Sequence, residues 1–182
     1  MGYAIAAASV ALGAETTLIS GPTGLPAPAG VRFVAVESTA DLHEAVRREF
    51  KTSDCLIMAA APSDYRPARP ADKKLKRSGP LRIELEPTPD ILKSIAPKRR
   101  KGQIVVGFAL ETDNGLANAK KKLTEKSLDL IVLNLTGPDS GFGTDTNRVT
   151  LIQPGKRPDN WPVMDKDAVA VKLMQKIALL MS

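Results

Sequence analysis

The chain has 182 residues, 43% hydrophobic and 25% charged, with a single cysteine, which allows one domain of ordinary size and excludes a disulfide-rich mini-fold, collagen and a disordered tail. No apolar run approaches the ~20 residues needed to cross a bilayer, so we expect a cytoplasmic protein with no membrane partner. The net charge of +6 indicates an anionic partner, either nucleic acid or a phosphorylated small molecule.

The predicted elements alternate between helix and strand. In chain order they are a helix at 3–12, strands at 15–20 and 31–36, a helix at about 41–50, strands at 55–60 and 81–85, a helix from 90 to about 95, a strand at 104–109, a helix at about 113–127, strands at 128–133 and 149–152, and a helix at about 165–181.

Continuous apolar runs at 55–60, 104–109 and 128–133 are typical of strands buried on both faces. Buried strands that alternate with helices predict an α/β fold, Rossmann-like and doubly wound, with a mostly parallel sheet. Ligands bind such sheets beyond the carboxyl ends of the strands, which carry Gly21, Ala60, Ala109 to Glu111, and Asn134.

Residues 62–87 interrupt this rhythm with many prolines and a basic cluster, Lys73 to Arg77. We interpret them as a flap or arm that projects from the core. A phosphate-rich ligand would relieve the repulsion within the cluster, although a solvated loop is the alternative. A second basic run, Lys98 to Lys101, lies in a connection at the other edge of the sheet, and we expect it to be exposed.

Two further features could bind a nucleotide. Asp64 follows the small residues 59–61, which would allow a ligand close to the backbone, and its carboxylate could accept hydrogen bonds from a ribose. A tight turn with a solvated Asp64 is the alternative. Lys122 and Lys126 lie four residues apart, so they share one face of a helix; there they could also simply complement the helix dipole.

Seven segments carry a more specific pattern. They are GAETTLISGP at 13–22, AAAPSDYR at 59–66, KLKR at 74–77, TPDIL at 88–92, GFALET at 107–112, KLTEK with LDLIVLN between 122 and 134, and GFGTDTN at 141–147. In this order they resemble the phosphopantothenoylcysteine synthetase (phosphopantothenate–cysteine ligase) family. In bacteria that domain is usually the C-terminal half of the bifunctional Dfp-type coenzyme A enzyme.

The resemblance implies a ligase that joins 4′-phosphopantothenate to cysteine through an acyl-cytidylate, with CTP and Mg²⁺. It implies a homodimer in which the arm of one subunit covers the site of the other. FMN would belong only to an upstream decarboxylase half that is not in this sequence, and no metal ligand is implied. The implied site residues are Lys74 as the catalytic flap lysine, Lys122 and Lys126 on the triphosphate, and Ala60, Asp64, Lys74 and Phe108 near the nucleotide.

The family starts with a strand, a glycine-rich turn and an NxSSGxMG segment, of which Met1 and Gly2 match only the end. We therefore expect a single domain over residues 1–182 that lacks the family's first strand and glycine-rich loop. We expect this chain to be inactive by itself.

Other functions remain open. One is a non-catalytic nucleotide-binding or dimerisation module. Another is an NAD(P)-dependent oxidoreductase, but the Tyr-x-x-x-Lys pair is missing, since Ala7 and Arg69 stand four residues after Tyr3 and Tyr65. Nucleic-acid binding is disfavoured because aromatic residues do not interleave with the basic ones. The preference for CTP over ATP follows from the family alone.

Overall fold

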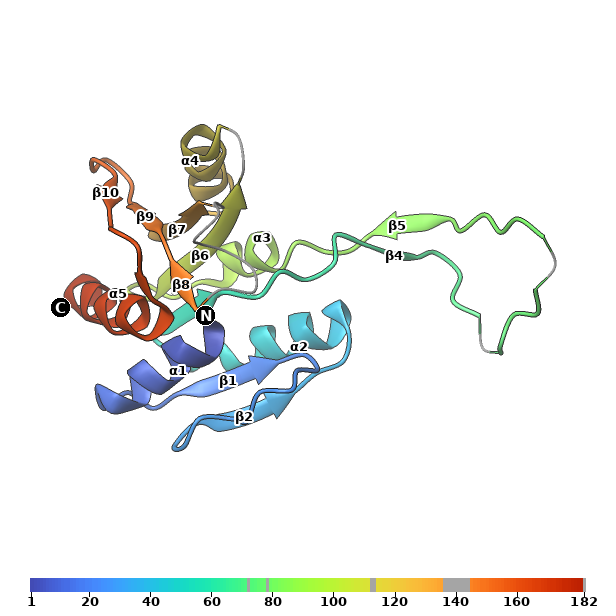
Figure 1. Ribbon diagram of the computed structural model, residues 1–182, viewed down its shortest axis with the longest axis horizontal. Helices are drawn as coiled ribbons and strands as arrows, with labels where there is room; N and C mark the ends of the chain where they lie inside the picture. The colour runs from blue at the N-terminus through green and yellow to red at the C-terminus, as the bar shows by residue number, and fades with distance from the viewer. Residues whose placement is uncertain (72, 78, 112–113, 136–144, 182) are drawn as a thin grey trace.

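The computed structural model describes residues 1–71, 73–77, 79–111, 114–135 and 145–181. The elements, most of which are labelled in Figure 1, are α1 (Gly2–Ala11), β1 (Thr17–Ser20), β2 (Arg32–Ala35), α2 (Thr39–Glu49), β3 (Cys55–Met58), β4 (Tyr65–Pro67), β5 (Leu85–Pro87), α3 (Ile91–Ile95), a 3-10 turn (Ala96–Lys98), β6 (Ile104–Glu111), α4 (Gly115–Glu125), β7 (Leu130–Leu135), β8 (Thr146–Asn147), β9 (Val149–Ile152), β10 (Asp159–Asn160), β11 (Met164–Asp165) and α5 (Lys166–Met181).

The main sheet has five strands in the order β10-β9-β7-β6-β3. Strands β3, β6 and β7 are parallel, and β9 and β10 add an antiparallel edge. Strands β1 and β2 form a separate parallel pair, with Ile19 opposite Val34. The predicted α/β fold with a mostly parallel sheet is confirmed, although its parallel strands are divided between these two sheets.

Alternate residues of β6 face two different helical layers. Val105 and Ala109 pack with α2, α3 and α4, whereas Val106 and Phe108 pack with α1 and α5. Val106 has no exposed surface. This burial on both faces explains why the strand is a continuous apolar run in the sequence.

Residues 62–87 form an arm, and Figure 1 shows it extending far from the helices and the sheet. Within it, β4 pairs with β5 antiparallel, and the side chains of Arg66 and Glu86 form an ion pair of 2.7 Å across the two strands. The predicted strand at 81–85 is wrong in its position, because only Leu85 of that run belongs to β5, and the carbonyl oxygen of Glu84 extends the pairing by accepting the backbone N–H of Ala68 (3.0 Å). Pairing with β4 determines which residues of the returning chain become a strand.

Arg99 also differs from expectation. It was expected to be solvent-exposed, yet it is only partly exposed, and its guanidinium donates hydrogen bonds to the carbonyl oxygens of Gln103 (2.8 Å) and Ser127 (3.0 Å). It also pairs with the carboxylate of Asp129. Arg99 thus joins the turns that precede β6 and β7, while Lys101 is exposed as expected.

Gln103 joins α2 to the start of β6 through three hydrogen bonds. Its side-chain nitrogen donates to the carbonyl oxygens of Phe50 (2.7 Å) and Ser53 (2.6 Å), and its side-chain oxygen accepts from the backbone N–H of Arg100 (2.7 Å). The residue is 3% exposed, so water cannot replace these bonds.

We expect Gln103→Ala to lower the free energy of unfolding by about 2 kcal/mol, because it leaves buried polar groups without partners. Urea unfolding at pH 7 measures this value. Gln175→Ala is the matched control, since Gln175 is exposed on α5 and its loss should change stability by less than ~0.5 kcal/mol. Equal effects of the two substitutions would contradict the prediction.

Candidate functional site

The carboxyl ends of the parallel strands meet at one edge of the sheet, which we call the ligand edge. Ala60 and Asp64 follow β3, Glu111 ends β6, and Asn134 lies near the end of β7. The first turn of α1 reaches this edge, because a Cβ added to Gly2 would lie 3.7 Å from the Cβ of Ala59. The edge is where an α/β sheet of this kind binds ligands.

The predicted nucleotide contacts next to β3 and in β6 lie on or near this edge. Ala60 and Asp64 are exposed, whereas Phe108 is half-buried against the layer of α1 and α5. The arm is fixed at its base by Thr88, which donates its backbone N–H to the carbonyl oxygen of Asp64 (2.9 Å) and its hydroxyl to that of Ser63 (2.6 Å). The backbone at Asp64 is therefore held where the arm leaves the sheet.

Lys122 reaches the end of β6 from the second half of α4. Its Nζ lies 2.6 Å from Oε1 of Glu111, and Nδ2 of Asn118 donates to Oε2 of the same carboxylate at 3.0 Å. These two hydrogen bonds hold the pKa of Glu111 below its usual value. Glu111 is therefore ionised at neutral pH and paired with Lys122.

Lys126 has a different partner. Its Nζ lies 3.0 Å from a carboxylate oxygen of Asp90, whose other oxygen caps α3 by accepting the backbone N–H of Lys93 (3.1 Å). Partial burial opposes ionisation of Asp90, but the bonds from Lys93 and Lys126 outweigh it and lower the pKa of this carboxyl. The two lysines predicted to share one face thus contact two separate carboxylates.

The structure does not bring Lys74 to the other predicted site residues. Lys74 is exposed and lies in the distal part of the arm, between β4 and β5, away from the body of the domain. Within this one chain, the predicted site residues that lie on or near the ligand edge are Ala60, Asp64, Phe108 and Lys122.

Sequence reasoning placed Glu111 at a carboxyl end of the sheet but gave it no role, and it missed Asn118 and Asp90 as partners of the site. One signal was available for Glu111, an acidic residue that ends a buried strand at the ligand edge. Thr112 and the Gly141–Phe142 part of the family pattern lie outside the described residues.

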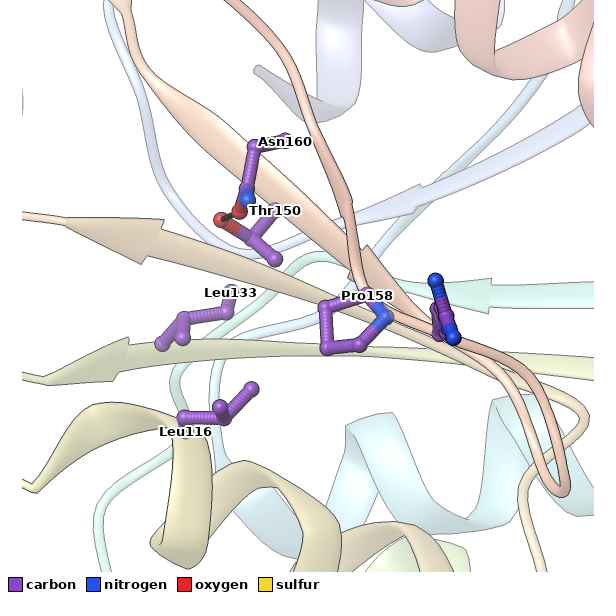
Figure 2. Close-up of a pocket in the computed structure, with 6 residues that line it drawn as sticks. Leu116, Leu133, Thr150, Pro158 and Asn160 are labelled. Atoms are coloured by element: carbon purple, nitrogen blue, oxygen red, sulfur yellow. Dashed lines mark hydrogen bonds between the residues drawn. The ribbon is translucent and has the colours of Figure 1, made fainter.

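A cavity of about 410 Å³ lies between α4 and the strands β7, β9 and β10 (Figure 2). Leu116, Leu133 and Pro158 supply its apolar wall, and Thr150 donates a hydrogen bond to Asn160 at 2.7 Å. None of the predicted site residues lines this cavity.

Other chemistry finds little support in the described part of the chain. No group of three or more His, Cys, Asp or Glu side chains gathers there as a metal site. Burial raises the pKa of Cys55 to about 12, so its thiol is not a nucleophile at neutral pH. No helix among the described residues is long and apolar enough to span a membrane.

Asp90→Asn keeps an oxygen that can cap α3 and removes the charge that faces Lys126. Because the folded pKa of Asp90 is lowered, the ionised carboxylate stabilises the fold above pH ~4, and this contribution is lost as the pH falls through the folded pKa. After allowance for solvent screening, we expect a loss of about 0.5 kcal/mol at pH 7 and a smaller difference from wild type at pH 3.

Urea unfolding at both pH values measures this difference. Asp54→Asn is the control. The side chain of Asp54 is 79% exposed, and its carboxylate lies 3.8 Å from the guanidinium of Arg100, so the substitution removes a charge from an exposed ion pair. The same loss at pH 3 as at pH 7 would show that the charge of Asp90 is not the cause.

Comparison with known proteins identifies the family to which the chain is similar. The model of the DNA/pantothenate metabolism flavoprotein C-terminal domain matches residues 1–180. The coenzyme A biosynthesis bifunctional protein CoaBC of Bacillus subtilis (strain 168) is 44% identical over 99% of this chain and 45% of its own length. A cysteine/cysteine sulfinic acid decarboxylase of an unknown prokaryotic organism is 43% identical over 99% of this chain and 51% of its own length. The chain thus spans about half the length of these curated relatives.

A solved structure gives the same result for the fold. The crystal structure of the C-terminal domain of a coenzyme A biosynthesis bifunctional protein CoaBC has a TM-score of 0.83 at 38% identity, and the match covers 98% of this chain and 81% of that one. The chain therefore belongs to the family of the DNA/pantothenate metabolism flavoprotein C-terminal domain, and the resemblance to a phosphopantothenoylcysteine synthetase domain that its motifs indicated is confirmed.

Proposed function

We propose that this domain is a phosphopantothenate–cysteine ligase of coenzyme A biosynthesis that uses CTP and works in the cytoplasm. The observation that carries the proposal is family membership over nearly the whole chain, together with a lysine ammonium group held at the ligand edge. The activity suggested by the name of the decarboxylase relative is not transferred, because this chain covers only about half of that protein, whereas it covers 81% of a solved C-terminal domain of a CoaBC protein.

The proposed reaction has two steps. A carboxylate oxygen of 4′-phosphopantothenate attacks the α-phosphorus of CTP, and pyrophosphate leaves with the electron pair of the broken bond. The amine of cysteine then attacks the acyl carbon, loses a proton and displaces CMP, which leaves an amide. Catalysis of such a transfer consists mainly of positioning the reactants and neutralising the charge on the leaving pyrophosphate.

The chain's own residues supply these effects in the following way. Lys122 and Lys126 bind the triphosphate, and Ala60, Asp64 and Phe108 contact the nucleotide. Mg²⁺ would add charge neutralisation on the phosphates. The described residues offer it no cluster of ligands, which fits an ion that arrives on the triphosphate, as Mg²⁺ usually does.

We further propose a homodimer in which the arm of one copy supplies Lys74 to the site of the other. Large apolar side chains on the arm support a protein partner, because Leu75, Leu81 and Ile83 are each more than 60% exposed. Their burial by a second copy would place the basic cluster of the arm near the bound triphosphate.

Lys122→Gln and Lys126→Gln should each weaken Mg²⁺–CTP binding roughly tenfold to a hundredfold, because each removes a charge-assisted hydrogen bond to phosphate. Calorimetry on the 182-residue chain measures the dissociation constants. Lys101→Gln is the matched control, since Lys101 is exposed in the turn before β6, and it should bind like wild type. An equal loss with Lys101→Gln would contradict specific binding by the α4 lysines.

The 182-residue chain by itself should bind CTP but form no phosphopantothenoylcysteine. The family's glycine-rich turn and most of its NxSSGxMG segment have no counterpart in these 182 residues. Release of pyrophosphate from CTP in the presence of 4′-phosphopantothenate and cysteine is the measurement, with ATP as the parallel nucleotide. Robust turnover would refute the expectation, and binding without turnover is also what a nucleotide-binding or dimerisation module would show.

A further inference from the structure

Glu111 is the last residue of β6, and its side chain is more deeply buried than that of Lys122, with which it forms an ion pair. The side chain of Glu111 is 14% exposed, whereas that of Lys122 is 42% exposed. Each carboxylate oxygen has its own donor, Nζ of Lys122 at 2.6 Å and Nδ2 of Asn118 at 3.0 Å. The acid is thus fixed on two sides, and the ammonium keeps a face toward solvent.

The packing of α4 makes this arrangement specific. Gly115, Asn118 and Lys122 are spaced by three and four residues, so they lie on one face of α4. A Cβ on Gly115 would lie only 3.2 Å from the Cβ of Glu111, which shows that α4 packs directly on the end of β6. Side chains on a helix lean toward its N-terminus, and this brings the ammonium of Lys122 back to the ligand edge.

We propose that Glu111 is a positioning residue, which holds the ammonium of Lys122 at the ligand edge so that it binds a polyphosphate chain. This inference rests on the proposed function and deepens it. An ammonium has three N–H donors, and Glu111 uses one of them. Without this acid, the four-carbon stem of Lys122 would leave the ammonium free to move away from the edge.

A double-mutant cycle tests the inference, with Mg²⁺–tripolyphosphate and Mg²⁺–CTP as the probes in calorimetry on the full chain. We expect Glu111→Gln to weaken binding of both about fivefold to tenfold, and the double variant with Lys122→Gln to bind no more weakly than Lys122→Gln alone. Glu125→Gln is the control, because Glu125 lies 3.8 Å from Lys121 and 3.9 Å from Lys93, and its loss should leave binding unchanged.

A second readout needs no nucleotide. The ¹⁵N NMR signal of the Lys122 ammonium should show slowed hydrogen exchange in wild type and fast exchange in Glu111→Gln. If that variant fails to fold, Glu111→Asp replaces it, because a side chain shorter by one methylene keeps the charge but loses the contact with Lys122. Unchanged exchange, or additive losses in the cycle, would overturn the role of Glu111.

The outcomes also separate this inference from the proposed function. If the wild-type chain binds tripolyphosphate and the double-mutant cycle gives the expected losses, but CTP does not bind, the role of Glu111 is supported and CTP is contradicted as the nucleotide. Binding of neither probe by the wild-type chain overturns the role of Glu111 in polyphosphate binding.

Discussion

Burial of β6 and β7 on both faces is the constraint on which the rest of the structure depends. Val106, Leu130 and Val132 have no exposed surface, so helices must cover both sides of the sheet. The pairing of β3, β6 and β7 in parallel requires crossover connections, and these bring the carboxyl ends of the strands to one edge. The ligand edge is therefore a consequence of how the core is buried.

The same constraint explains how much of the fold could be predicted. Continuous apolar runs located β3, β6 and β7 from the sequence alone. The predicted burial of the first of these runs on both faces is wrong, because β3 is an edge strand of the main sheet and Cys55, Leu56 and Ile57 are only partly buried. The strand near Leu85 was misplaced, because alternation shows which residues are half-exposed but not which of them meet β4. The short strands β8, β10 and β11 have two residues each, too few for any period to be visible.

The candidate site was less predictable, for a reason that lies in its side chains. Spacing correctly indicated that Lys126 follows Lys122 by one helical turn, since Lys126 caps α4 and its backbone N–H donates to the carbonyl oxygen of Lys122 (3.0 Å). It could not indicate their partners, because Glu111 lies 11 residues from Lys122, and Asp90 is brought to Lys126 only by the packing of α3 beside α4. A lysine has a long flexible stem, so the position of its charge depends on a tertiary partner.

The position of the arm relative to the body of the domain also bears on the candidate site. The basic cluster of the arm lies outside the body of the domain, whereas the ammonium of Lys122 is fixed at the end of β6. Thr88 holds the arm at its base, and the Arg66–Glu86 ion pair joins its two strands, so the arm is an extended unit that leaves Lys74 away from Lys122 within one chain. Under the proposed function, Lys74 would therefore reach a triphosphate bound at Lys122 from a second copy. Burial of the exposed apolar side chains of the arm would then favour that assembly.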